Sequence, residues 1–213
     1  NRPVGRTSIT FSQITCQGDS VMKRLVADAK SLAVTNEIIT ITGERCINKN
    51  AFAWAIHNFS NRSDKLFTQI NCYDMTLESR EDEIFGSVDS NNMVESLGKL
   101  WIAYQGTIYF NDIDALPLFL QDQLVSFIKT GSIRLNSQSD IPADTRILCS
   151  SAKDLKELTA AGLFREELYY RICKNELVLP PLRERPKDVE YLFRTYVSFF
   201  GKRIASTDME ITP

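Results

Sequence analysis

The sequence predicts an α/β fold, with a five-stranded, mostly parallel sheet flanked by helices. Segments rich in β-branched residues alternate along the chain with segments whose apolar residues recur at helical spacing. The chain has 213 residues, of which 43% are hydrophobic, so it can bury one sizeable core. Polar side chains that follow parallel strands should then meet at one edge of the sheet.

The first strand and the helix after it form the clearest unit. Residues 38–42 (IITIT) have strand composition, and from Phe52 onward the apolar residues recur as they do in a helix. Residues 21–33 have the same helical spacing and predict a helix before this unit. The other expected strands are residues 66–71, 106–113, 145–150 and 175–179, the last ended by Pro180 and Pro181.

Between these strands the chain has patterns typical of helices and loops. Residues 75–85 are acidic and predict a helix, and residues 87–92 (SVDSNN) predict a flexible polar excursion. Residues 118–130 predict an amphipathic helix that ends at Gly131. Residues 186–200 predict one more helix near the end of the chain.

Composition and charge exclude several classes of protein. The net charge of −2 provides no global basic field of the kind that binds nucleic acid or an anionic membrane. The five cysteines are odd in number and show no C-x-x-C spacing, which favours reduced thiols over disulfides or a zinc site. No apolar run is long enough to span a bilayer, and we expect no signal peptide. We therefore expect a cytoplasmic protein without a membrane partner.

The loop after the first strand is close to a phosphate-binding loop. Gly43 is followed six residues later by Lys49, near the spacing G-x-x-x-x-G-K-[ST]. Asn48 stands where the second glycine belongs, and Asn50 stands where the metal-binding hydroxyl belongs. Because asparagine tolerates the left-handed conformation well, Asn48 could hold the turn, whereas Cys46 is a poorer substitute. Lys49 offers a counter-charge for phosphate, although a single lysine after a loop is more often solvated than catalytic.

The third strand ends in Asn111 and Asp112, at the edge where such proteins hold metal. A nucleotide hydrolase carries a carboxylate pair here, one for Mg²⁺ and one that orients water. An amide at the first position removes a full charge, so we expect Asn111 and Asp112 to hold Mg²⁺ only weakly. Asp112 is also one methylene shorter than glutamate, so as a catalytic base it would sit back from its water. The candidate nucleotide-binding residues are Gly43, Glu44, Arg45, Cys46, Ile47, Asn48, Lys49, Asn50 and Asn111.

Two later segments make a resemblance specific. Residues 164–172 (FREELYYRI) and 179–185 (LPPLRER) resemble the arginine-finger region and the segment after it in bacterial enhancer-binding proteins. These NtrC-family regulators activate the enhancer-dependent sigma factor, sigma-54, through a central AAA+ domain. Shorter matches follow in the same order: Gly43-Glu44, Ala55-Ile56-His57, Asn71-Cys72, Phe85-Gly86, Gly106-Thr107 and Leu116-Pro117.

The resemblance implies a fold and a domain organisation. It implies an AAA+, phosphate-loop NTPase-like core over residues 13–183, and the start of a small, truncated helical lid over residues 184–213. Residues 1–12 would be a linker from a preceding receiver domain, and a helix-turn-helix would follow the chain. The implied partners are other copies of the chain in a dimer or a hexameric ring, RNA polymerase holoenzyme, and promoter DNA through the C-terminal domain.

The departures from the family pattern carry the functional expectation. The family's loop is GESGTGKE, where this chain has GERCINKN, and its Asp-Glu pair is replaced by Asn111-Asp112. The polar sensor after the fourth strand is replaced by Ala152, and no GAFTGA loop follows Phe85-Gly86. Arg165 and Arg171 match the fingers that reach a neighbour's nucleotide. Ion pairing of these arginines with Glu166, Glu167 or Glu184 is the equally weighted structural alternative.

These losses favour a degenerate AAA+ domain kept for assembly and for sensing a nucleotide or another effector. The pattern is similar to that of atypical members that regulate biofilm genes, which implies cyclic di-GMP as effector and work with the housekeeping polymerase. Arg2, Arg6 or Arg45 could stack on a guanine, although each is more simply a solvated charge. Two alternatives stay open: a slow ATPase that uses Lys49, Asp112 and the trans arginines, and an ATP- or ADP-binding switch without hydrolysis.

Overall fold

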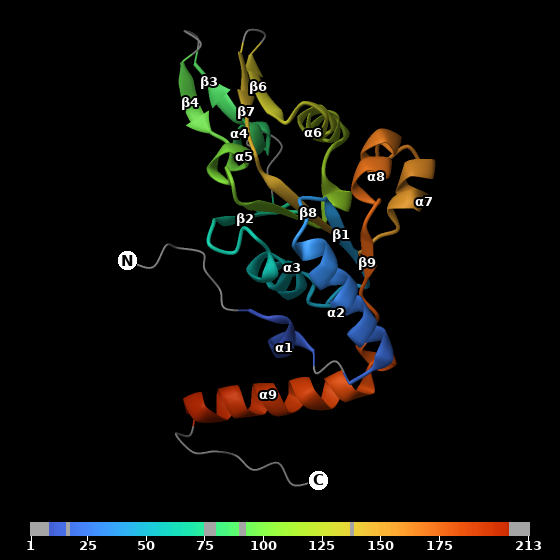
Figure 1. Cartoon of the computed structure of the whole chain (residues 1–213). Helices are drawn as coiled ribbons and strands as arrows, with labels where there is room; N and C mark the ends of the chain where they lie inside the picture. Colours follow the sequence, from blue (N-terminus) through green and yellow to red (C-terminus); the bar gives the residue numbers. More distant parts are fainter. Residues whose placement is uncertain (1–8, 16–17, 75–79, 90–92, 137–138, 205–213) are drawn as a thin grey trace.

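A computed structural model describes residues 9–15, 18–74, 80–89, 93–136 and 139–204. Its centre is a five-stranded sheet in the order β2-β5-β8-β1-β9, with every neighbouring pair parallel (Figure 1). All five expected strands are therefore confirmed. The strands are β1 (Ile39–Thr42), β2 (Phe67–Asn71), β5 (Thr107–Asn111), β8 (Arg146–Ser151) and β9 (Glu176–Val178).

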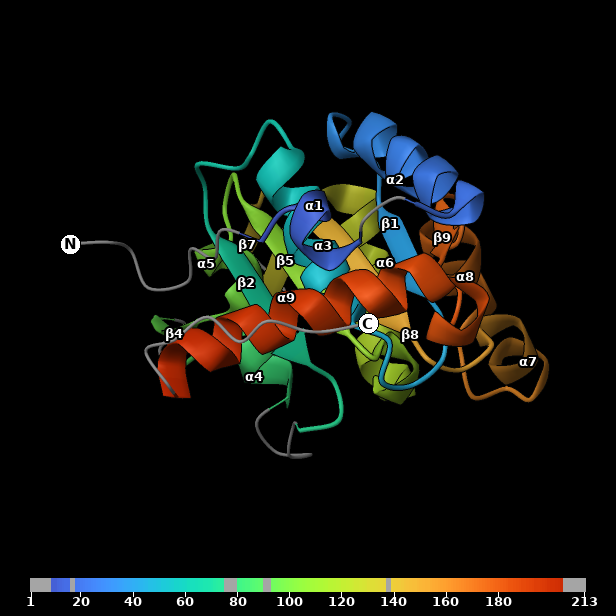
Figure 2. The same cartoon turned by 90° about the horizontal axis from the view of Figure 1, so that it is seen from below.

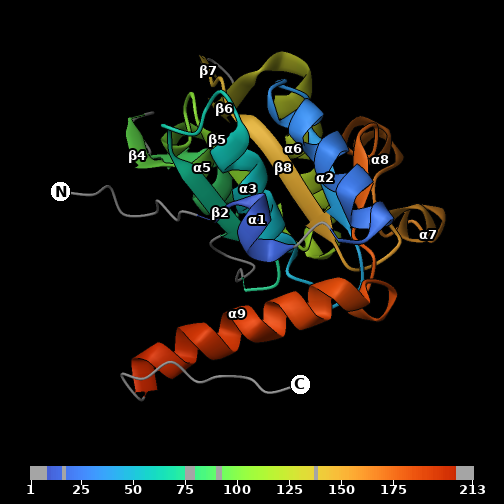
Figure 3. The same cartoon turned by 60° about the horizontal axis from the view of Figure 1, so that its bottom comes forward.

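Helices cover both faces of this sheet, as predicted. Along β5, Ile108 and Phe110 face one hydrophobic cluster with α6 and α8, whereas Tyr109 faces another with α1, α2 and α3 (Figure 3). The two-residue period of a strand explains this division, because successive side chains point to opposite faces. The helices are α1 (Phe11–Ile14), α2 (Ser20–Ala33), α3 (Lys49–Phe59), α4 (Arg80–Phe85), α5 (Lys99–Ile102), α6 (Leu118–Thr130), α7 (Leu155–Ala160), α8 (Glu166–Ile172) and α9 (Pro186–Ile204), with short 3₁₀ turns η1 (Ile113–Ala115) and η2 (Leu182–Glu184).

Two antiparallel hairpins extend from the same end of the molecule (Figure 1). One pairs β3 (Gly86–Val88) with β4 (Val94–Leu97), and the other pairs β6 (Ser132–Asn136) with β7 (Ser139–Pro142). The prediction of a flexible excursion was wrong for residues 87–88, which lie in β3, while residues 90–92 lie outside the described residues. The three residues of β3 (GSV) are too few to show an alternating apolar pattern, so the sequence did not indicate the pairing across the hairpin.

The predicted acidic helix is found as α4 over residues 80–85, and residues 75–79 lie outside the described residues. Near the start of the chain, Phe11 is only 4% exposed and packs edge-on against Phe52, with ring centroids 5.3 Å apart. The packed core therefore includes residues expected in the linker, because one aromatic side chain in a polar stretch suffices to anchor it.

Helix α9 lies across the N-terminal segment, below α1 (Figures 2 and 3). Thr15 Oγ1 donates to the buried carboxylate of Asp188, at 2.9 Å from Oδ1 and 2.8 Å from Oδ2. The buried guanidinium of Arg185 lies 3.4 Å from the same carboxylate, and the Tyr191 hydroxyl donates to the Ser12 carbonyl at 2.5 Å. The predicted helix is confirmed, four residues longer than expected, and polar contacts join it to the core.

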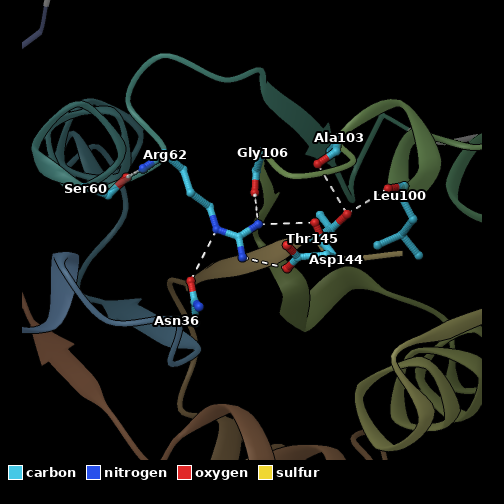
Figure 4. A network of polar contacts seen from close by, with 8 residues as sticks. All are labelled: Asn36, Ser60, Arg62, Leu100, Ala103, Gly106, Asp144 and Thr145. Atoms are coloured by element: carbon cyan, nitrogen blue, oxygen red, sulfur yellow. Dashed lines mark hydrogen bonds and ion pairs between the residues drawn. The ribbon is translucent and has the colours of Figure 1, made fainter. Parts of the chain in front are cut away.

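Arg62 ties together the edge of the sheet at which the strands begin (Figure 4). Its Nη1 donates to the carbonyls of Gly106 (3.2 Å) and Asp144 (3.1 Å), and its Nε donates to Asn36 Oδ1. Its Nη2 lies 2.6 Å from Asp144 Oδ1. This network holds together the segments that precede β5 and β8, at the edge of the sheet opposite the carboxyl ends of the strands.

Candidate functional site

A cleft of about 410 Å³ opens at the carboxyl edge of β1 and β5. It lies where the first strand's loop meets the end of the third predicted strand, so the expected gathering of polar residues is found. Gly43 and Glu44 belong to the same loop without lining the cleft. The residues that line it are Arg45, Cys46, Ile47, Asn48, Lys49, Asn50, Tyr73, Asn111, Asp112 and Ala152.

The loop keeps a tight turn with an unusual residue at its left-handed position. Gly43 has φ +154°, and a Cβ there would meet the Leu179 carbonyl oxygen at 2.8 Å, so glycine is required. Cys46 has φ +65°, a conformation that costs a non-glycine residue about 1–2 kcal/mol. The expectation that Asn48 holds the turn was wrong: its φ is −72°, and its Oδ1 accepts from the Ala51 amide at 3.0 Å. Asn48 is the N-cap of α3, the role that asparagine fills best.

Lys49 lies against its own loop. Its side chain is buried, and Nζ donates to the carbonyls of Gly43 (3.1 Å) and Glu44 (3.0 Å). Burial lowers the pKa of Lys49, while the charges of Asp112 and Asp114 act in the opposite direction. An ammonium group has three donors, so two carbonyl contacts leave one hydrogen for a ligand. Lys49 is thus a positioned cation rather than a freely solvated one.

Glu44 connects the loop to the segment before α9. Its carboxylate forms a two-point pair with Arg183 of η2, at 2.8 Å and 2.6 Å. The Arg183 guanidinium lowers the pKa of Glu44. The loop and the start of the predicted lid are therefore joined directly, by a pair that the sequence motifs alone did not indicate.

Asn111 and Asp112 lie at the back of the cleft in a fixed arrangement. Asn111 Oδ1 accepts from the hydroxyls of Tyr109 and Ser150, each at 3.1 Å, and its Nδ2 donates to Asp112 Oδ2 at 3.2 Å. The Asp112 backbone is left-handed, with φ +54°, and its amide donates to Ser150 Oγ. Burial, followed by the charge of Asp114, raises the pKa of Asp112.

A second carboxylate, Asp114, was not among the predicted site residues. Its side chain is fully buried and accepts from Tyr73 (3.0 Å) and Ser151 (3.0 Å), with the Lys153 ammonium 3.3 Å away. The sequence signal was the spacing N-D-I-D, which places a second acid two residues after Asp112. Its partners come from two other segments, after β2 and at the end of β8, so only the folded chain shows that this charge is already paired.

The residues of the cleft do not fit a resident Mg²⁺ ion. Mg²⁺ prefers near-octahedral oxygen ligands with carboxylates among them, and Asp112 is the single carboxylate lining the cleft. The Asn50 side-chain oxygen is buried and has no hydrogen-bond partner within the described part of the chain. Ala152 has no polar atom on its side chain. No group of three or more histidine, cysteine or acidic residues suited to a metal occurs among the described residues.

A second hollow, of about 500 Å³, lies on the other side of the loop, against α9. Cys46, Ile47 and Asn48 line both spaces, so the two are separated only by the loop. Most of its wall is apolar, which suits a flat aromatic ring. The sequence did not indicate it, because its lining comes from five distant segments: Gln13, Ile14, Met22, Cys46, Ile47, Asn48, Phe52, Leu179, Leu182, Arg185, Leu192 and Tyr196.

The two predicted arginine fingers do not line the cleft of their own chain. Arg165 precedes α8 and pairs with Asp122 at 2.8 Å, while Arg171 pairs with Glu167 at 3.0 Å. The ion-pair alternative is thus found for Arg171 with one of its expected partners, and for Arg165 with a residue of α6. Both side chains are partly exposed, so these pairs contribute little to stability.

The comparisons with known proteins agree with this geometry. Residues 15–178 match the family model of the sigma-54 interaction domain. The chain belongs to this family. It is 34% identical to the Nif-specific regulatory protein of Azorhizobium caulinodans, over 87% of this chain and 31% of the relative. It is also 34% identical to the transcriptional regulatory protein TyrR of Salmonella typhimurium, over 90% of this chain and 36% of the relative.

Solved structures confirm the AAA+ fold of this sigma-54 interaction domain. NtrX from Brucella abortus in complex with ADP matches with a TM-score of 0.81 and 26% identity, over 92% of this chain and 44% of that chain. NtrX in complex with ATP matches equally well, also at 26% identity. The chain spans about a third of the length of the curated relatives, whose names describe bacterial regulators.

Proposed function

We propose that this domain binds ATP or ADP and assembles with other copies, as part of a bacterial transcription regulator, with little or no ATP hydrolysis. One observation carries the proposal. The loop keeps its glycine turn, and the cleft keeps a positioned lysine and an adjoining apolar hollow. The position of the metal-binding acid, however, is occupied by the neutral side chain of Asn111, and the position of the polar sensor is occupied by Ala152. The groups expected to bind a nucleotide are therefore present, while two groups expected to assist its hydrolysis are replaced.

Binding is supported by the chemistry of the loop. Phosphate would meet the N-terminus of α3, where the helix dipole favours an anion, while the Ala51 amide there is bonded to Asn48. Lys49 supplies a fixed positive charge beside it, and Arg45 lines the same cleft. The related NtrX was solved with ADP and with ATP, which supports the same ligand class here.

Weak hydrolysis follows from the groups that would have to orient water. Asp112 accepts a hydrogen bond from Asn111, and burial raises its pKa. Phosphoryl transfer depends on metal ions and on a trans arginine to neutralise developing charge. Asn111 weakens the contribution of the metal ion, because its side chain carries no charge. The ion pairs of Arg165 and Arg171 must break before either side chain could act as the trans arginine in a dimer or hexamer.

Calorimetry with ATP and ADP, combined with a turnover assay, tests the proposal. Lys49→Ala should weaken binding at least tenfold, because it removes the fixed cation beside the phosphates, a loss of about 1.4 kcal/mol or more. Lys156→Ala, on the exposed side of α7, is the matched control and should leave affinity unchanged. Turnover comparable to that of intact relatives, or affinity insensitive to Lys49→Ala, would contradict the proposal.

A slow ATPase remains the second candidate, because Asp112 lines the cleft together with Lys49. If it is correct, Asp112→Asn should abolish the residual turnover while nucleotide affinity changes little. Residual turnover that survives this substitution would contradict the catalytic role assigned to Asp112.

The regulatory setting is a further part of the proposal. The biofilm-regulator resemblance favours cyclic di-GMP as effector, and Arg45 is the expected contact that lies within the described residues; Arg2 and Arg6 lie outside them. Polymerase contact would use a surface other than a GAFTGA loop, since the sequence after Phe85-Gly86 lacks that motif. Titration with cyclic di-GMP tests the effector, with Arg45→Ala expected to abolish binding.

The described helices include none long and apolar enough to cross a membrane.

A further inference from the structure

We infer that this cleft takes the phosphates of its nucleotide as a metal-free anion, and that Asn111 turns Mg²⁺ away because its amide nitrogen, not its oxygen, is left on the cleft side. The inference rests on the proposed function, because it concerns how the same site recognises its ligand. It depends on three observations: the orientation of one amide, the charges around the cleft, and the lack of a second cation ligand.

Linked hydrogen bonds set the orientation of the Asn111 amide. The Asp112 backbone amide donates to Ser150 Oγ at 3.2 Å, so the Ser150 hydroxyl hydrogen is free to point to Asn111 Oδ1. The Tyr109 hydroxyl lies 2.8 Å from Ser150 Oγ and 3.1 Å from Asn111 Oδ1. Tyr109 and Ser150 are both fully buried, so water does not compete for their hydroxyls.

The opposite orientation is unfavourable. It would place the amide oxygen 3.2 Å from Asp112 Oδ2, where two acceptors would face each other without a hydrogen between them. The observed orientation instead gives Asp112 a donor and leaves Asn111 Nδ2 beside the cleft. A nitrogen with hydrogens repels a cation and attracts a phosphate oxygen.

The charges around the cleft favour an anion. Of its lining residues, Arg45 and Lys49 are positive and Asp112 is negative. The nearby carboxylate of Asp114 adds no metal ligand, because its side chain is fully buried and bonded to Tyr73 and Ser151, with Lys153 beside it. A phosphate chain therefore meets an excess of positive charge without a bound metal.

The remaining candidate cation ligand is Asn50. Its side-chain oxygen is buried without a hydrogen-bond partner among the described residues, but it is a single neutral atom. One carboxylate and one amide oxygen provide less than the charged, near-octahedral set that draws Mg²⁺ out of its hydration shell. Asn50 marks the position where a hydroxyl would complete a metal site.

Titration calorimetry of the 213-residue chain with ADP, in excess MgCl₂ and in EDTA, tests the inference. We expect affinity in EDTA to equal or exceed that in MgCl₂, because Mg²⁺ in solution only removes the free anion from the protein. Affinity more than twofold tighter with MgCl₂ would overturn the inference while leaving the proposed function intact. The absence of ADP binding in both buffers would overturn both.

Matched substitutions identify the residue responsible. Asn111→Asp should gain a preference for MgCl₂ of about tenfold, and Asn111→Asp combined with Asn50→Thr should gain more. Asn61→Asp adds the same charge after α3, at the opposite edge of the sheet, and should bind ADP as the unsubstituted chain does. Thermal unfolding of each variant checks that the fold is kept. A folded Asn111→Asp variant without any magnesium preference would contradict the role assigned to Asn111.

Discussion

Cys46 is an unusual residue in the loop after β1, because it occupies a left-handed position that favours glycine. Its left-handed backbone carries a side chain where glycine would be least strained, and that side chain lines both the cleft and the apolar hollow. An exposed thiol therefore stands at the boundary between the two parts of the expected ligand site. This position makes Cys46 a natural reporter of occupancy.

Alkylation by iodoacetamide should distinguish Cys46 from Cys173. Burial, with smaller contributions from Glu176 and Asp154, raises the pKa of Cys173 to about 12. A raised thiol pKa lowers the thiolate fraction, to about one in 10⁴ near pH 8, and only the thiolate reacts. We expect Cys46 to be modified first and to be protected by ADP. Cys173 should react slowly, and faster as pH rises, with or without ADP.

Peptide mass spectrometry at several pH values would follow both sites in one sample. Equal rates at Cys46 and Cys173 near neutral pH, or ADP protection of Cys173 alone, would contradict the assignment of the site.

The β3–β4 hairpin shows how one element depends on a close backbone contact. Gly98 follows β4, and a Cβ there would lie 2.3 Å from the Phe85 carbonyl carbon and 2.4 Å from the Gly86 amide nitrogen. Such distances are possible only without a side chain. The hairpin is thus held against the end of α4 at its base.

Gly98→Ala should destabilise the chain by about 1–3 kcal/mol, because backbone atoms must shift to admit the methyl group. Gly131→Ala is the matched control: Gly131 has φ +65° but open space around it, so it should cost only about 1 kcal/mol of conformational strain. Urea unfolding followed by circular dichroism measures both. A smaller loss for Gly98→Ala than for Gly131→Ala would show that the contact relaxes freely.

The elements that the sequence predicted are those with their own apolar pattern. All five strands of the sheet could be found from short apolar stretches, and α6 from its spacing and its end at Gly131. The two hairpins could not, because their stability comes from pairing and from contacts such as that of Gly98. The loop residues were correctly located, but their conformations were exchanged: Cys46 has the left-handed backbone and Asn48 caps the helix.

Within the site, residues adjacent in sequence were predictable and contacts across segments were not. Asn111 and Asp112 were expected at the edge of β5, where they lie. The direction of the Asn111 amide depends on Tyr109 of the same strand and on Ser150 of the neighbouring strand β8, and the contact with Ser150 could not be read from the sequence.

For the whole molecule, the packing of α9 on the core is decisive. Asp188 is completely buried and bonded to Thr15, with the 6% exposed Arg185 beside it. Because α9 also contributes Leu192 and Tyr196 to the apolar hollow, its position determines whether that space exists.

Asp188→Ala should reduce the free energy of unfolding by about 3–5 kcal/mol, because it leaves the buried Arg185 charge without this partner. Hydrogen exchange should show loss of protection over α9 before the sheet is affected, and nucleotide affinity should fall. Glu190→Ala, which breaks only the exposed pair with Arg194 on the same helix, is the control and should cost less than about 1 kcal/mol. Unchanged protection in α9 would show that other contacts suffice to hold it.

The ion pair between Glu44 and Arg183 joins the loop after β1 directly to the turn before α9. Any ligand that draws the loop inward pulls on Glu44, and Arg183 transmits that pull to the turn three residues before α9. Binding and release of a ligand in the cleft would then change the position of α9. For such a coupling the energy source is ligand concentration, and no bond of the ligand has to be broken.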